Sequence, residues 1–272
     1  MKEKVWIHIP KNFQRYLQPW IGYFSYETED EDLGRSVAYS FITNNKKYEN
    51  LIDLLKKQNI RYFIFRREYL FSKTEIENSE ILKLKVFANA KNSYSSDHEG
   101  NICSACGEKV QKLYRHKLHV DYKNIRKYDI SVTYSGDTEI IISDKVKDLM
   151  IKEKISGIEF YPVFQLGSEN QVINNFFHLK LSEGIGEVVE PSIVDRTEKK
   201  CSQCGFYKKF LCQTPLYFKR ETWKQDDICY TLNWFGSPPY AQGKWVIISQ
   251  RLYRILKDNK INFFSVEPSF FI

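Results

Sequence analysis

No run of 18 consecutive apolar residues occurs in this sequence of 272 residues. A transmembrane helix needs about 20 such residues, so we expect no membrane-spanning helix. The first ten residues, MKEKVWIHIP, contain neither an apolar core nor a small-residue cleavage site, and we expect no secretion signal. These absences, together with cysteine spacing typical of metal sites, predict a cytoplasmic protein whose thiols stay reduced.

Sequence motifs of the common enzyme classes are also absent. The chain contains no P-loop, no GxGxxG, no HExxH and no GxSxG nucleophile elbow. Its five histidines are dispersed, and only His116 and His119 are close in sequence. We therefore expect no enzymatic activity, and we assign no catalytic residue and no small-molecule substrate.

Neither sign of charge is in large excess. The 41 Lys and Arg residues face 34 Asp and Glu residues, which leaves a net charge of +7. Residues 109–127 mix bases with aromatic residues, as nucleic-acid-binding surfaces do. A solvated face beside a zinc site has the same composition, and we prefer that interpretation. A zinc-dependent nucleic-acid-binding regulator is kept as the alternative function.

Four of the six cysteines form the most informative pattern of the chain. Residues 103–107 read Cys-Ser-Ala-Cys-Gly, and residues 201–205 read Cys-Ser-Gln-Cys-Gly. Two thiolates three positions apart can hold one metal ion from a single turn, and the glycine that follows permits a positive φ. Two such knuckles complete a tetrahedral zinc site with no open position for water. We therefore predict a structural Zn²⁺ site with four ligands: Cys103, Cys106, Cys201 and Cys204.

The long separation of the two motifs leaves other metal sites open. The 94 residues between Cys106 and Cys201 far exceed the roughly 15–20 of a compact zinc ribbon, so the fold must bring the knuckles together. His116 and His119 could instead complete a local two-Cys two-His finger with the first knuckle, although both gaps are short for such a finger. A thioredoxin-like redox site would need one CxxC that opens a helix.

The remaining two cysteines are predicted to be ordinary buried or half-buried thiols: Cys212 and Cys229. Spacing alone leaves open whether either of them, or His116 or His119, joins the metal site.

The sequence also contains an internal repeat. Residues 142–155 align without gaps to residues 248–261 at an offset of 106, and the alignment carries Pro162 onto Pro268. The two CxxCG motifs are offset by only 98, so the second unit is eight residues longer between knuckle and helix. We place this insertion in the Pro/Gly-rich segment 236–243, which is either a passive insertion in a hairpin or, as our first candidate for a recognition element, a loop that contacts a partner.

Each repeat is expected to run from a strand through a helix into a second strand. Short β-branched runs at 140–142 and 246–248 predict buried strands. Ser143 and Ser249 then occupy the N-cap positions of helices whose apolar residues recur at i, i+3 and i+4. Strands are expected to leave these helices at 158–163 and 263–266, and a weaker helix-then-strand signal covers 48–59 and 60–65.

Further expected elements are strands at 128–134, 176–181 and 228–235, a hairpin turn at 135–137, a loop at 89–100 and a turn at 182–186. These patterns predict an α+β fold with few helices and a mostly antiparallel sheet, built from two related strand–helix–strand units joined by a shared zinc-knuckle pair. We place an N-terminal α/β region at 1–100, the first CxxCG unit at 101–190 and the second at 191–272, within one compact body.

The doubled CxxCG motif, with the segments Ile142–Val146 and Gly157–Val163, resembles the double-CXXCG motif family. Its members are described as immunity proteins of bacterial contact-dependent or polymorphic toxin systems. The resemblance covers about residues 103 to 205, and the second repeat extends it to Pro268. It implies a non-catalytic cytoplasmic protein that binds and neutralises a cognate protein toxin, and it implies no catalytic residues.

Such a protein would bind through surface complementarity with a few aromatic or charged anchors. The candidate anchors are the five tryptophans: Trp6, Trp20, Trp223, Trp234 and Trp245.

Overall fold

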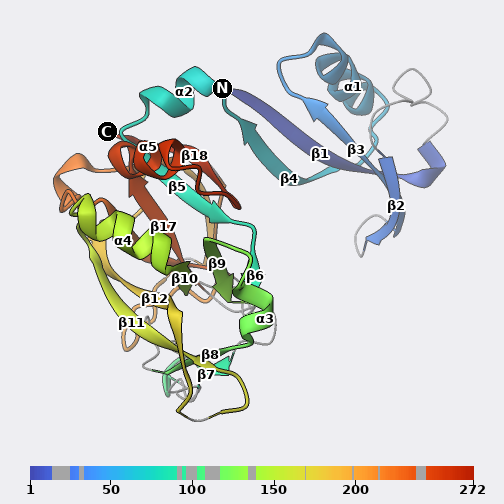
Figure 1. Cartoon of the computed structure of the whole chain (residues 1–272). Coiled ribbons are helices and arrows are strands. Elements are labelled where there is room, and N and C mark those ends of the chain that lie inside the picture. Colours follow the sequence, from blue (N-terminus) through green and yellow to red (C-terminus); the bar gives the residue numbers. More distant parts are fainter. Residues whose placement is uncertain are drawn as a thin grey trace. The chain divides into compact units, whose positions relative to one another are not determined.

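The structure is a computed structural model that describes residues 1–13, 25–30, 34–90, 94–95, 103–107, 117–133, 139–168, 170–197, 199–213, 215–236 and 243–272. The chain divides into two units, Met1–Glu75 and Ile76–Ile272 (Figure 1). Few helices accompany mostly antiparallel strands, as the sequence predicts. Residues 76–90, which we had placed with the N-terminal region, belong to the second unit because strand β5 (Ile81–Val86) pairs with C-terminal strands.

The first unit is a four-stranded antiparallel sheet with one long helix. Its elements are β1 (Lys2–Pro10), β2 (Ser25–Asp30), β3 (Gly34–Ile42), α1 (Lys46–Lys57) and β4 (Phe63–Leu70), and the strand order is β2-β3-β1-β4. The side chain of Asn45 accepts a hydrogen bond from the Lys47 N–H and begins α1. Leu51 and Leu55 of the helix are buried in the core of this unit, so the weaker helix-then-strand signal is confirmed.

The second unit begins within helix α2 (Lys73–Asn78) and holds both CxxCG motifs. After β5 its elements are β6 (Asn89–Ala90), β7 (Tyr94–Ser95), β8 (Leu118–Val120), α3 (Tyr122–Ile125), β9 (Ile130–Thr133), β10 (Ile140–Ser143), α4 (Asp144–Lys152), β11 (Ile158–Gln165), β12 (Val172–Ile185), β13 (Ile193–Arg196), β14 (Phe210–Gln213), β15 (Leu216–Phe218), the 3₁₀ turn η2 (Arg220–Thr222), β16 (Ile228–Phe235), β17 (Gly243–Ser249), α5 (Gln250–Asp258) and β18 (Phe264–Phe271).

Two segments of this unit, β10–α4–β11 and β17–α5–β18, have helices of equal length followed at the same spacing by strands of equal length, although β17 is longer than β10. Each helix and the strand after it begin 106 residues later in the second segment than in the first. Ser143 and Ser249 are the N-caps of the two helices, as predicted, and the Ser249 hydroxyl accepts a hydrogen bond from the Leu252 N–H. Lys154 and Lys260 both take a positive φ, of 52° and 55°, directly after the two helices.

Each of these segments surrounds a central antiparallel strand. Strand β12 lies between β10 and β11, and β5 lies between β17 and β18. The registers correspond, since Pro162 faces Phe177 in one segment and Pro268 faces Leu82 in the other. Strand β5 precedes the first CxxCG motif yet completes the segment that follows the second motif. Strand β12 precedes the second motif and completes the segment that follows the first.

One apolar core joins the two segments. Val146 and Met150 of α4 and Leu252 and Leu256 of α5 are all buried in it, and Figure 1 shows both helices over the sheet. Along β17 the side chains alternate as a strand requires: Val246 and Ile248 enter this core, whereas Ile247 enters a second core on the opposite face. Each fully buried Leu or Ile of this kind contributes about 1.5–3 kcal/mol.

Two local expectations were wrong. The turn at 182–186 is instead the last part of β12, which continues to Ile185 and pairs in parallel with β16. Close approach explains the glycine there, because a Cβ on Gly184 would lie 2.5 Å from the Cβ of Cys229. The loop at 89–100 contains the short strands β6 and β7. The hairpin turn at 135–137 lies outside the described residues.

Candidate metal centre

The two CxxCG motifs form knuckles of the same shape. The N–H of Gly107 donates to the Cys103 carbonyl and the N–H of Gly205 donates to the Cys201 carbonyl, each at 2.8 Å. The two glycines take φ values of 74° and 73°, which lie in the left-handed region that glycine adopts without strain. This turn places both sulfurs of each motif on one side of the chain, as metal-binding knuckles require.

The structure brings the four predicted thiols together. All four sulfur atoms lie within 4.8 Å of one another. The Sγ atoms of Cys103 and Cys201 are 3.7 Å apart, and those of Cys106 and Cys204 are 3.6 Å apart. Four sulfurs bound to one zinc at about 2.3 Å would be separated by about 3.8 Å. The cluster therefore has the size and the donor set of a tetrahedral four-cysteine metal site.

Hydrogen bonding lowers the pKa of one of these thiols, whereas burial raises the pKa of another. The backbone N–H groups of Cys204 and Gln203 lower the pKa of Cys201 to about 6. Burial and, to a smaller extent, the neighbouring thiols raise the pKa of Cys204 to about 12. A divalent cation among the sulfurs would favour the thiolate form of all four, because a positive charge stabilises each of them.

Contacts outside the sulfurs hold the second knuckle in place. The Cys201 N–H donates to the Phe206 carbonyl at 2.8 Å, and the Phe206 ring lies 5.0 Å from the Trp234 ring of β16. Between the knuckles, the Ser104 hydroxyl donates to Gln203 Oε1 at 2.9 Å. The sequence did not predict this last contact, because it depends on how the two motifs face each other.

Those of the other candidate ligands that the structure describes do not join the cluster. Among the described residues the four cysteines are the only group of His, Cys, Asp and Glu arranged to hold a metal. His119 is buried on β8 with its ring 5.5 Å from Phe164, and His116 lies outside the described residues. Cys229 is fully buried on β16 and Cys212 is half-buried on β14, as predicted, and burial raises the pKa of each to about 12.

Four of the five tryptophans are packed against other side chains. Trp6 is buried, Trp223 stacks on Phe271, Trp234 contacts Phe206, and Trp245 stacks on Phe235 at 3.8 Å. Trp20 lies outside the described residues, as do 237–242 of the Pro/Gly-rich loop and 109–116 of the basic segment.

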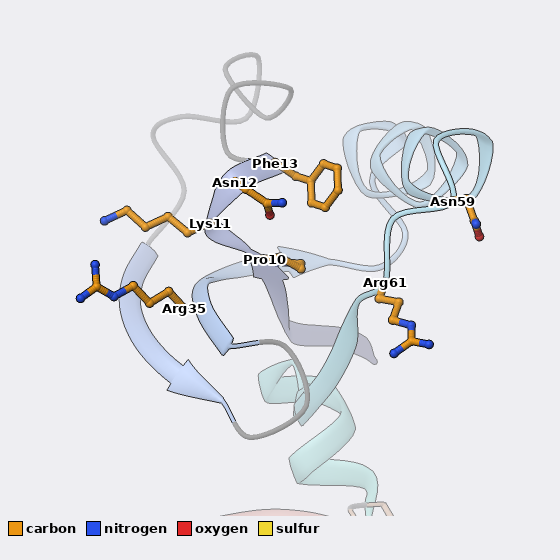
Figure 2. A pocket seen from close by; sticks show the side chains of 7 residues that line it. All are labelled: Pro10, Lys11, Asn12, Phe13, Arg35, Asn59 and Arg61. Carbon is orange, nitrogen blue, oxygen red and sulfur yellow. The ribbon is translucent and has the colours of Figure 1, made fainter.

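The first unit contains a hollow of about 700 Å³. It is lined by Pro10, Lys11, Asn12, Phe13, Arg35, Asn59 and Arg61. In Figure 2 the side chains of Lys11 and Arg35 point to one side, whereas those of Asn59 and Arg61 point to the other. The lining cations therefore do not converge on one point, and this hollow presents no catalytic arrangement.

The described helices include none that is both long and apolar enough to cross a bilayer. No protein-family model matches the chain, and a comparison with curated proteins also finds no match.

Proposed function

We propose that this chain is a non-catalytic binding protein, held together by a structural Zn²⁺, that neutralises a bacterial protein toxin in the cytoplasm. The observation that carries the proposal is the closed cluster of Cys103, Cys106, Cys201 and Cys204. Four thiol ligands would complete the tetrahedral coordination of zinc, so no position would remain for a reacting water. A site of this kind supports a fold and leaves binding to the rest of the surface.

Zinc is the metal that fits this donor set best. Soft thiolates favour Zn²⁺, Cu⁺ and iron–sulfur clusters over Mg²⁺ and Ca²⁺, and a tetrahedral set of four sulfurs is typical of zinc or iron–sulfur sites. The two matching knuckles with a glycine after each second cysteine are the form in which structural zinc sites occur. When bound, the ion would hold together two segments 98 residues apart, and its binding energy would add to the stability of the fold.

The scaffold would consist of two related segments, β10–α4–β11 around β12 and β17–α5–β18 around β5. The equal lengths of α4 and α5 and of β11 and β18, together with the matching strand registers, support a common origin. Because residues of both segments, of β5 and of β12 lie in one apolar core, the two segments would unfold together. A shared zinc would join them at a second place. Such a scaffold is rigid, and rigidity lowers the entropy cost of binding a partner.

The toxin partner is supported by the doubled CxxCG motif, which resembles the immunity family. The protein would act by covering the active site of its toxin or by holding the toxin in an inactive form. Neither mechanism needs a catalytic residue in this chain.

Co-expression tests the proposal directly. The chain should protect bacterial cells from the toxin domain encoded beside its own gene, and the two purified proteins should form a complex of fixed stoichiometry. Absence of both protection and complex would reject the toxin-binding function. If the purified chain instead bound single-stranded oligonucleotides with strong salt dependence, the nucleic-acid alternative would replace it.

A further inference from the structure

The two related segments carry side chains of very different size at one pair of corresponding positions. The Ser182 N–H donates to the Gly157 carbonyl at 2.9 Å in the first segment, and the Phe87 N–H donates to the Phe263 carbonyl at 2.8 Å in the second. The backbone is therefore the same at both places. The first segment, called the first copy below, carries Gly157 and Ser182 at these positions. The second segment, called the second copy, carries Phe263 and Phe87.

Both phenylalanines are exposed. The exposed fraction is 64% for Phe87 and 46% for Phe263, and Phe87 has the largest value of any large apolar residue among those described. Neither side chain is buried in the core, so core packing does not explain why these two positions carry phenylalanine. Solvent-facing aromatic residues at neighbouring positions are typical of protein-binding surfaces.

The backbone at Phe263 is unfavourable for a large side chain. Its φ is 68°, in the region where Gly157 of the other copy has a φ of 87°. Glycine adopts this conformation freely, whereas a bulky residue there is an outlier. Strained residues of this kind concentrate at functional sites, where the side chain has a use that outweighs the strain.

A groove lies directly beside Phe263. It has a volume of about 520 Å³ and is lined by Ile76, Tyr253, Lys257, Lys260, Ile261, Asn262, Phe263, Phe264, Ser265 and Val266. Its two charged lining residues are both lysines. Arg126 and Lys127 are exposed next to Tyr128, whose ring lies 4.6 Å from the Phe263 ring. The apolar surface therefore has a cationic rim, although Glu77 forms an ion pair with Lys257 at 3.2 Å.

The arrangement of the rings favours a protein over a nucleic acid. The Lys127 ammonium lies 5.2 Å from the centre of the Tyr128 ring, and the Lys257 ammonium lies 5.6 Å from that of Tyr253. Tyr128 also meets Phe263 edge to face, at 78°. Stacking of bases needs open ring faces, and one lysine ammonium lies near each of these tyrosine rings.

We propose that Phe87, Phe263 and the adjoining groove form the docking surface for an acidic protein face that carries an apolar anchor. This inference rests on the proposed function, and it identifies the surface that the toxin would contact. Charge complementarity argues for that partner, because lysines and arginines border the apolar surface. The anchor would fill the groove beside Phe263 while carboxylates of the partner face the lysines.

Exchange of residues between the two copies tests the docking surface. Phe87→Ser and Phe263→Gly introduce the residues that the first copy carries at these positions. The matched control is Ile151→Lys, which introduces the second copy's residue at an exposed apolar position on α4. The affinity for the toxin domain encoded beside the gene would be measured by calorimetry for each variant, with melting temperatures to verify folding.

We expect each phenylalanine variant to bind at least tenfold more weakly than the wild type, and the control to bind within twofold of it. Hydrogen exchange should slow at 86–88, 126–128 and 260–264 in the complex. Wild-type affinity in both phenylalanine variants would overturn this surface and leave the proposed function standing. A wild-type chain that forms no complex would overturn both.

Two other occupants of the surface would also overturn the inference. Binding of an oligothymidine that is lost in the phenylalanine variants would identify a nucleic-acid surface. A wild-type dimer in light scattering that becomes monomeric in Phe87→Ser would identify a second copy of this chain as the occupant.

Discussion

Asp129 and Asp227 occupy corresponding places ahead of the segments β10–α4–β11 and β17–α5–β18. Each of the two aspartates accepts a hydrogen bond from the serine that caps the helix of its segment. Ser143 donates to Asp129 at 3.2 Å, and Ser249 donates to Asp227 at 2.8 Å. Each aspartate follows the first cysteine of its knuckle by 26 residues. The second CxxCG motif is followed by eight more residues before its helix than the first motif is. These eight residues therefore all lie between Asp227 and Ser249, in the β16–β17 hairpin.

The two aspartates should contribute unequally to stability. Asp227 also accepts from the Ser156 N–H at 3.2 Å and from Arg251 at 2.7 Å, and its side chain is 12% exposed against 25% for Asp129. Hydrogen bonds to a charged group contribute about 1.5–3 kcal/mol each, and less where water competes. We expect Asp227→Ala to lower the free energy of unfolding by about 3 kcal/mol and Asp129→Ala by about 1 kcal/mol, measured by urea denaturation. Equal losses of unfolding free energy in the two variants would mean that the deeper burial and additional partners of Asp227 do not add to stability.

Removal of one cysteine from either knuckle should remove the metal. If one ion is shared, Cys106→Ala and Cys204→Ala should each abolish the zinc that elemental analysis finds in the wild type, and each should lower the melting temperature. Cys212→Ser is the control, since this thiol lies outside the cluster, and it should keep one zinc per chain. Two ions per chain, or one that survives Cys204→Ala, would show that the knuckles do not share a site.

Stability should depend on the protonation of Lys83 in alkaline solution. Burial lowers the pKa of Lys83 to about 8, although Glu267 lies 3.7 Å away, and the ammonium sits 3.3 Å from the centre of the Trp245 ring. Between pH 8 and 10.5 the unfolded chain binds more protons at this lysine, so the contribution of Lys83 to the free energy of unfolding, measured as the difference between the wild type and Lys83→Met, should rise with pH. The rise in this difference should be roughly 3 kcal/mol.

The control for this prediction is Lys85→Met, which removes a more exposed lysine that also pairs with Glu267. It should keep the pH dependence of the wild type. Equal slopes in the wild type and in Lys83→Met between pH 8 and 10.5 would mean that Lys83 titrates as an exposed lysine does.

Two glycines with similar backbone angles should respond differently to alanine. Gly157 has a φ of 87° and Gly167 a φ of 84°, so both substitutions impose strain of about 1–2 kcal/mol. A Cβ at Gly157 would lie 2.2 Å from the Ile228 carbonyl oxygen, whereas a Cβ at Gly167 would meet nothing within 4 Å. We expect Gly157→Ala to lower the melting temperature much more than Gly167→Ala. Similar effects would indicate that the backbone at Ile228 moves aside easily.

The second unit should fold without the first. A fragment of residues 72–272 keeps α2 and β5 and should unfold cooperatively in thermal circular dichroism. A fragment of residues 91–272 loses β5, the strand between β17 and β18, and should show no cooperative transition. Cooperative unfolding of the shorter fragment would show that β5 is dispensable for the core.

Much of this fold could be predicted because its signals are local. The apolar runs at 140–142 and 246–248, the capping serines and the helical periodicity after them depend only on neighbouring residues, and all correspond to observed elements. The wrong turn at 182–186 has a non-local cause, since β12 continues there by pairing with β16, a strand more than 40 residues away.

The sequence by itself determined which four thiols could bind a metal, because a knuckle needs only two cysteines and a glycine at fixed spacing. Only the tertiary structure decided that the two knuckles meet and that β5, which precedes both knuckles, lies between β17 and β18. It also decided that four tryptophans are packed while Phe87 and Phe263 face solvent. The reason is that strand pairing and burial depend on residues far apart in the chain, which no local pattern records.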